Sequence, residues 1–153
     1  MIRAKQRPES REQKRYACKK KIMRVLYETD QLILEHEYEY TRLRRKSPSD
    51  ILLEDDFYGD PDCGLIDIDN KWAIVAGEHL TIWTPKKSKK IMHERLKWVQ
   101  ALRLKDSETV EILIDPWSDE ASIWEINIHT FVIQRIRDFL DYREKEYTEN
   151  VIW

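Results

Sequence analysis

The stretch from Leu65 to Thr84 constrains the fold of this chain more than any other part of the sequence. Apolar and polar residues alternate along it with the period of two that is typical of half-buried β-strands. Near its middle lies Gly77-Glu78, and glycine at the first central position of a two-residue loop favours a type II′ turn. This pattern predicts an antiparallel hairpin.

The turn also predicts the register of the hairpin, with residue 76 opposite 79 and residue 72 opposite 83. Trp72 and Trp83 then become direct cross-strand neighbours. Side chains of consecutive strand residues point to opposite faces. One face is therefore expected to carry the aliphatic core, and the other to carry both tryptophans together with His79 and Asp67.

Further alternation predicts strands over residues 97–105, 109–114 and 122–128, and also over residues 31–41. Beyond them, apolar residues recur at intervals of three and four, which is typical of an amphipathic helix. They are Val132, Ile133, Ile136, Phe139 and Leu140. The sequence thus predicts an α+β fold, an antiparallel β-meander of five to seven strands with a C-terminal helix over 129–148.

The length of 153 residues, with 41% hydrophobic content, predicts a single domain with its own core. Residues 1–15 are almost purely polar and are expected to form a mobile tail. Residues 16–46 are expected to form a basic segment that is helical to about Met23 and continues into the strand over 31–41. Residues 47–128 are then the β-rich core. No internal repeat is evident.

The sequence contains no recognisable targeting signal and no cofactor-binding motif. No stretch approaches the ~20 apolar residues that a membrane helix requires, and the N-terminus resembles no signal peptide, so we expect a cytoplasmic protein. Cys18 and Cys63 lack partners at metal-ligand spacing and are expected to be reduced thiols. Three glycines cannot form a phosphate-binding loop, and no cofactor is expected.

Charge is segregated along the chain. Residues 1–46 carry a net charge of +7 and residues 47–85 a net charge of −8. The second block holds a cluster of carboxylates, among them Asp55, Asp56, Asp60, Asp62 and Asp67. The cluster does not follow the spacing of a calcium-binding loop, so we expect no bound metal. Solvated loop composition and a docking patch for a basic partner both remain open.

His79 is the histidine with the clearest catalytic potential, because the expected register places it beside the tryptophans and Asp67. An imidazole in such a place could act as an acid or a base. The alternative function is therefore a small hydrolase or nuclease, assisted by a metal, that uses the acidic loop and His79.

The tryptophan pair favours a different function, since tryptophan is enriched at the centres of protein interfaces. The N-terminal segment could instead cover this face. We expect a non-catalytic protein-binding module, an inhibitor or adaptor, that offers an acidic and aromatic surface to a basic protein. Its expected contact residues are Asp55, Asp56, Asp60, Asp62, Asp67, Trp72, Trp83 and His79.

In general character the chain is similar to small bacterial immunity proteins, although no family motif matches it residue by residue. The basic segment Arg11–Arg24 has the charge density of an arm that contacts phosphates. However, the isoelectric point of about 6.1 and the acidic segments do not favour nucleic acid as the partner. The oligomeric state is not indicated.

Overall fold

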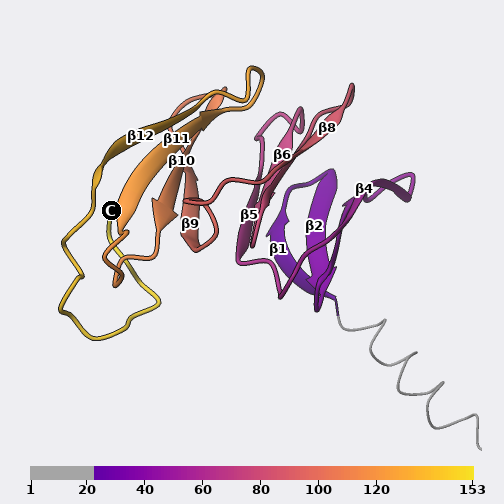
Figure 1. The fold of residues 1–153 in the computed structure, drawn as a ribbon. Helices are drawn as coiled ribbons and strands as arrows, with labels where there is room; N and C mark the ends of the chain where they lie inside the picture. Colours follow the sequence, from indigo (N-terminus) through magenta and orange to yellow (C-terminus); the bar gives the residue numbers. More distant parts are fainter. Residues whose placement is uncertain (1–22) are drawn as a thin grey trace, which may run out of the picture.

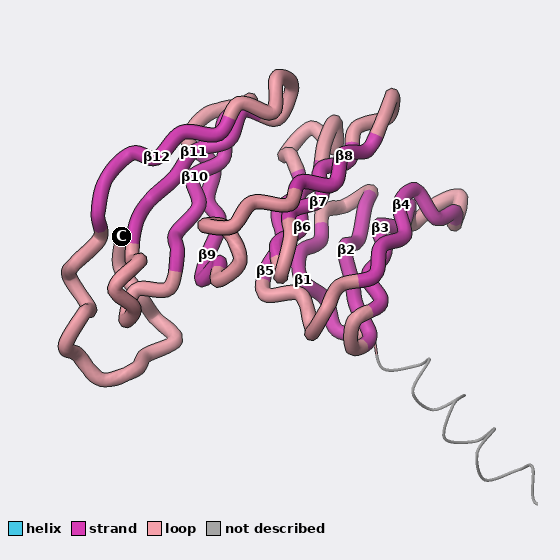
Figure 2. Tube along the Cα trace, viewed as in Figure 1, coloured by secondary structure: helices cyan, strands magenta, loops and turns pink. Residues whose placement is uncertain are grey.

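Antiparallel strands form all the regular structure within residues 23–153, the part of the chain that the computed structural model describes. Twelve strands make three four-stranded sheets, each connected in chain order (Figure 2). Sheet A comprises β1 (Arg24–Glu28), β2 (Leu32–Glu37), β3 (Tyr40–Arg45) and β4 (Asp50–Asp56). Sheet B comprises β5 (Cys63–Ile66), β6 (Ala73–Ala76), β7 (Leu80–Trp83) and β8 (Ser88–Ile91). Sheet C comprises β9 (Val99–Leu104), β10 (Thr109–Ile114), β11 (Ser122–Asn127) and β12 (Ile133–Asp138).

The three sheets stand side by side as a fan (Figure 1). Their first strands, β1, β5 and β9, lie next to one another along the inner side, and their last strands, β4, β8 and β12, lie apart on the outer side. Successive meanders that pack in this way are arranged like consecutive blades of a β-propeller. The first strands begin at residues 24, 63 and 99, so the structural repeat is 36 to 39 residues long.

Two hydrophobic layers hold the fan together, one on each side of sheet B. Between sheets A and B lie Leu32, Leu34, Leu43, Phe57, Ile66, Ala73, Val75 and Trp83. The layer between sheets B and C is larger and includes Trp72, Ile74, Leu80, Ile82, Ile112 and Trp124. Every residue of β6 and β7 is consequently buried. Sheet B is thus a central sheet with two apolar faces.

The predicted α+β fold is wrong, because the described residues contain no helix. The segment expected to be helical over 129–148 instead forms β12, which pairs with β11, and then an irregular segment. Valine and isoleucine favour strands, and an edge position on sheet C was open to them. Phe139, which follows β12, is fully buried in a third cluster with Leu113 and Ile123.

The predicted hairpin exists, but its register differs by one position. Gly77, Glu78 and His79 form a three-residue connection, and Ala76 pairs with Leu80. A slip of one residue turns a strand's side chains to the opposite face. Trp83 therefore lies opposite Ala73 in the layer toward sheet A, whereas Trp72 lies in the layer toward sheet C. The two indoles lie on opposite sides of the sheet.

The strand predicted over residues 31–41 is correct for residues 32–37, which form β2, but a turn at residues 38–39 ends this strand and β3 begins at Tyr40. The predicted tail over 1–15, the helix to about Met23 and Cys18 fall on residues 1–22, outside the described part of the chain. No helix of the described residues is long and apolar enough to cross a membrane.

Gly64 allows β5 to approach sheet A closely. A Cβ atom at this position would lie 2.3 Å from Cδ2 of Leu34, itself fully buried, and 3.2 Å from the carbonyl oxygen of Ile74. We expect Gly64→Ala to lower the free energy of unfolding by about 1 to 3 kcal/mol, the usual cost of overpacking a core. Urea denaturation measures this change, and Ser88→Ala on the exposed strand β8 serves as the control. An unchanged midpoint for Gly64→Ala would refute the close packing.

Candidate functional site

The two ends of the fan differ in charge. At one end lie the connections β2–β3, β4–β5, β6–β7, β8–β9 and β10–β11, which comprise residues 38–39, 57–62, 77–79, 92–98 and 115–121. These connections carry eight acidic and two basic residues. The six connections at the opposite end carry five of each. We call the first set the acidic end.

Large exposed side chains accompany the carboxylates there. Tyr58 is 87% exposed, Trp98 is 74% exposed, and Tyr38 and Met92 are also exposed. Tyrosine, tryptophan and methionine are enriched at protein interfaces relative to the rest of the surface. The acidic end therefore combines negative charge with aromatic surface.

A groove of about 560 Å³ opens at the acidic end. It lies between the β8–β9 and β10–β11 connections. Its lining residues are Glu94, Arg95, Trp98, Ile114, Asp115, Ser118 and Glu120. Ile114 is buried and belongs to the core layer between sheets B and C, whereas Trp98 is largely exposed. One side of the groove is thus formed by the buried core.

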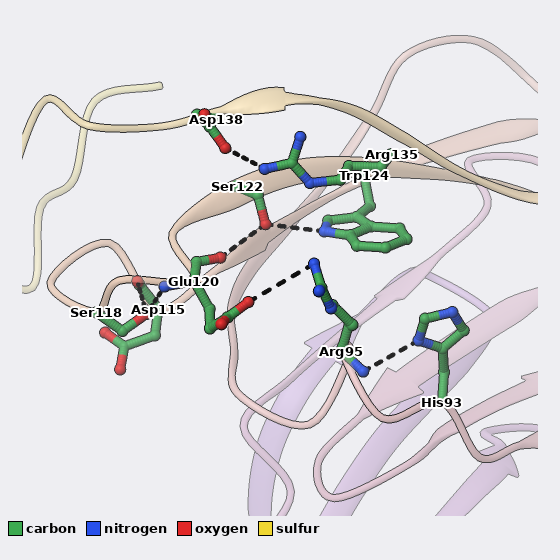
Figure 3. Close-up of polar contacts among 9 residues, drawn as sticks. All are labelled: His93, Arg95, Asp115, Ser118, Glu120, Ser122, Trp124, Arg135 and Asp138. Carbon is green, nitrogen blue, oxygen red and sulfur yellow. Dashed lines mark hydrogen bonds and ion pairs between the residues drawn. The ribbon is translucent and has the colours of Figure 1, made fainter.

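Hydrogen bonds hold the two walls of the groove. The amide of Asp115 donates to the carbonyl oxygen of Trp98 at 2.9 Å, which joins one connection to the other. Within the β10–β11 connection, the amide of Glu120 donates to Oγ of Ser118 at 3.1 Å. Across the groove, Nη1 of Arg95 lies 3.7 Å from Oε2 of Glu120, and Figure 3 shows the guanidinium pointing toward that carboxylate. This ion pair is long and exposed.

One wall also connects with the core (Figure 3). His93 packs edge-on against Trp124 with ring centroids 5.3 Å apart, and Trp124 donates from Nε1 to Oγ of Ser122 at 2.9 Å. Ser122 in turn donates to the carbonyl oxygen of Glu120 at 2.8 Å. The position of Glu120 is therefore tied to the buried indole.

His79 lies at the same end but inside the fold, where it links sheets A and B. Its Nε2 is 2.8 Å from Oδ2 of Asp55 on β4, and its Nδ1 is 2.6 Å from Oε1 of Glu78. The ring stacks on Phe57 with centroids 4.0 Å apart. Thr81 also donates a hydrogen bond to Asp55. The hydrogen bond with His79 lowers the pKa of Glu78.

This geometry gives His79 a role in structure. Its side chain has no exposed surface, and both ring nitrogens already have carboxylate partners. A general base needs a ring nitrogen within reach of a substrate.

Within residues 23–153, no group of three or more His, Cys, Asp or Glu residues could hold a metal ion. Burial raises the pKa of Cys63 and so keeps its thiol a weak nucleophile.

The residues predicted as contact sites fall into three places. Asp56, Asp60 and Asp62 are exposed at or beside the acidic end, and Asp55 lies there beneath the surface with His79. Asp67 is buried at the opposite end, where its carboxylate accepts from the amide of Lys71. Trp72 is 1% exposed and Trp83 is 8% exposed, each within a different core layer.

The groove residues are not among the predicted contact residues. The predicted strand over 97–105 includes Trp98, but this residue precedes β9 and its side chain is largely exposed. The signal available was its position in a polar stretch, between Lys97 and a run that begins at Val99. Nothing in the sequence indicated that residues 115–121 would lie beside it.

Asp62 predicts a pH dependence of stability. Although the residue is exposed to solvent, partial desolvation of its carboxyl group by the surrounding chain, and then the nearby Asp60, raises the pKa of Asp62 to about 6. The folded state therefore binds the proton of the Asp62 carboxyl group more tightly than the unfolded chain does. As a result, the free energy of unfolding falls as the pH rises from about 4 through 6. We expect Asp62→Asn to be more stable than the parent at pH ~7.5 by less than about 1 kcal/mol, since water still screens the carboxylate. Thermal melts should show the difference vanish near pH ~4; a constant difference would contradict the shift.

Fold and site together define an all-β protein of three blade-like sheets with an acidic, aromatic end. A scan against protein-family models finds no match for this chain. A search of curated proteins finds no relative either.

Proposed function

We propose that this chain is a non-catalytic protein-binding module, an inhibitor or adaptor that engages a basic protein through its acidic end. The observation that carries the proposal is the difference between the two ends of one fold: eight acidic residues against two basic at one, and five against five at the other. Complementary charge steers association and suppresses wrong partners. The exposed aromatic side chains at the same end supply apolar contact area.

The proposed surface keeps Asp56, Asp60 and Asp62 from the sequence-based hypothesis and replaces its aromatic part. Tyr58 and Trp98 take the place of the buried tryptophans. The metal-assisted hydrolase is not proposed, because His79 is enclosed and both its nitrogens are occupied.

Site-specific photo-crosslinking in the host cell tests the proposal. A crosslinking amino acid at Tyr58 should capture a basic protein, and the same amino acid at Lys87, at the opposite end, should not. With the captured protein purified, the triple variant Asp60→Lys, Asp62→Lys and Glu120→Lys should weaken its binding at least about tenfold. These three residues are exposed, so the variant should fold.

A matched charge reversal at the opposite end is the control and should leave the dissociation constant nearly unchanged; it combines Asp69→Lys, Asp106→Lys and Glu108→Lys, three exposed positions. Equal crosslinking from both ends, or a triple variant that binds like the parent, would reject the proposal.

A further inference from the structure

Trp98 stands among carboxylates in the groove. Its indole is 74% exposed, and Glu94, Asp115 and Glu120 line the groove with it. Arg95 is the one basic residue of the lining set, so the groove carries a net formal charge of −2. The face of an indole attracts cations. A carboxylate nearby can form a charge-assisted hydrogen bond with the same cation and so strengthen its binding.

Elsewhere in the same chain, an arginine side chain contacts an indole and a carboxylate together. On sheet C, the guanidinium carbon of Arg103 lies 3.9 Å from the ring centroid of Trp153. Nε of the same arginine bonds to Oε1 of Glu111 at 3.0 Å. One arginine thus stacks on an indole and binds a carboxylate at the same time. The lining of the groove also includes an indole and carboxylates, and the indole is open to solvent.

Because the acidic end is the proposed binding surface, we propose that the Trp98 groove is the subsite for an arginine side chain of the protein partner. The subsite depends on that proposed function. Arginine suits it better than lysine, since the planar guanidinium can stack on the indole while its N–H groups form paired hydrogen bonds with a carboxylate. An ammonium group can satisfy only one of these requirements well.

Arg95 acts as an internal competitor for this subsite. Its Nη1 lies 3.7 Å from Oε2 of Glu120, and both side chains are more than half exposed. An exposed ion pair at this distance contributes little. A partner's arginine can therefore displace Arg95 from Glu120 at low cost, and removal of Arg95 should make binding tighter.

Short peptides test the subsite on the full chain. The probes are a glycine-spaced peptide with two arginines, its lysine counterpart, and its citrulline counterpart, which has the same shape without the charge. Binding is followed at low salt by the indole N–H resonance of Trp98, assigned with Trp98→Phe. We expect the arginine peptide to bind at least about tenfold more tightly than the citrulline peptide and more tightly than the lysine peptide.

Three variants locate the binding. Titration calorimetry measures Trp98→Ala, which lacks the reporter indole, and this variant should bind the arginine peptide at least about tenfold more weakly. Arg95→Gln should bind it a few-fold more tightly. Ile68→Ala, which replaces an 81% exposed apolar residue at the opposite end, should have no effect. Equal affinity for all three peptides, or equal losses with Trp98→Ala and Ile68→Ala, would overturn the subsite. If the charge-reversal variant loses the crosslinked partner while Trp98→Ala keeps it, the subsite fails and the proposed function stands.

Discussion

Asp55→Ala is expected to lower the free energy of unfolding by about 3 kcal/mol. The carboxylate of Asp55 accepts hydrogen bonds from the buried His79 and from Thr81, across the boundary between sheets A and B. Removing the carboxylate leaves the buried donors of His79 and Thr81 without this acceptor, and each unsatisfied buried polar group costs about 1 to 3 kcal/mol, or about 2 to 6 kcal/mol together. The lower end applies here because Glu78 still contacts the ring at 2.6 Å. Urea denaturation with an unchanged m value measures the loss.

Asp56→Ala is the matched control for this experiment. Asp56 is the next residue of β4, but it points away from His79 and is exposed. Its replacement should change stability by no more than about 0.5 kcal/mol. If both variants lost the same stability, His79 would not join the two sheets. Asp55→Ala should reduce partner binding only in proportion to the fraction of the protein that is unfolded.

Phe139→Ala should cost about 3 to 5 kcal/mol, the range for removal of a buried phenylalanine. Phe139 is fully buried on the outer face of sheet C with Leu113 and Ile123. Around this cluster pack Ala101, Tyr142, Val151 and Trp153, so the segment after β12 covers that face. Loss of Phe139 would remove the anchor of this cover. Thermal and urea denaturation should agree on the loss.

Leu140→Ala distinguishes the observed fold from the helix predicted for the same residues. In an amphipathic helix, Phe139 and Leu140 would both lie on the apolar face, and both substitutions would be costly. In the structure Leu140 is 51% exposed. We therefore expect a loss below about 1 kcal/mol for Leu140→Ala. Similar large losses for both variants would favour the helix.

Local alternation predicted much of the β structure correctly. The predicted strands over 109–114 and 122–128 correspond to β10 and β11, and the one over 31–41 is correct for β2 but wrong at the turn over 38–39. Their period of two is a property of each strand alone, because side chains alternate whatever the strand packs against. The connection near Gly77 was also placed correctly, but its length of three residues was not, and this difference moved Trp83 to the other face.

The repeat of three sheets was not predicted, because the three sheets do not need similar amino-acid sequences to adopt the same arrangement of strands. Each requires apolar side chains only where it meets its neighbour. Sheet B is covered on both sides and is apolar throughout β6 and β7, whereas sheet A keeps charged residues on its outer face, where Glu35 pairs with Arg42 and Arg44. The position of a sheet in the fan therefore determines which of its strand residues are apolar, and this pattern differs from one sheet to the next.

By itself, the sequence determined most of the strands β2, β9, β10 and β11 and the loop that is rich in carboxylates, since these follow from local periodicity and residue type. The tertiary structure alone decided which residues meet. It buried Trp72, Trp83 and His79, and it brought Trp98 beside Asp115 and Glu120, which follow it by 17 and 22 positions. Contacts between sheets depend on packing across faces, and that packing also turned the last apolar repeat into a strand.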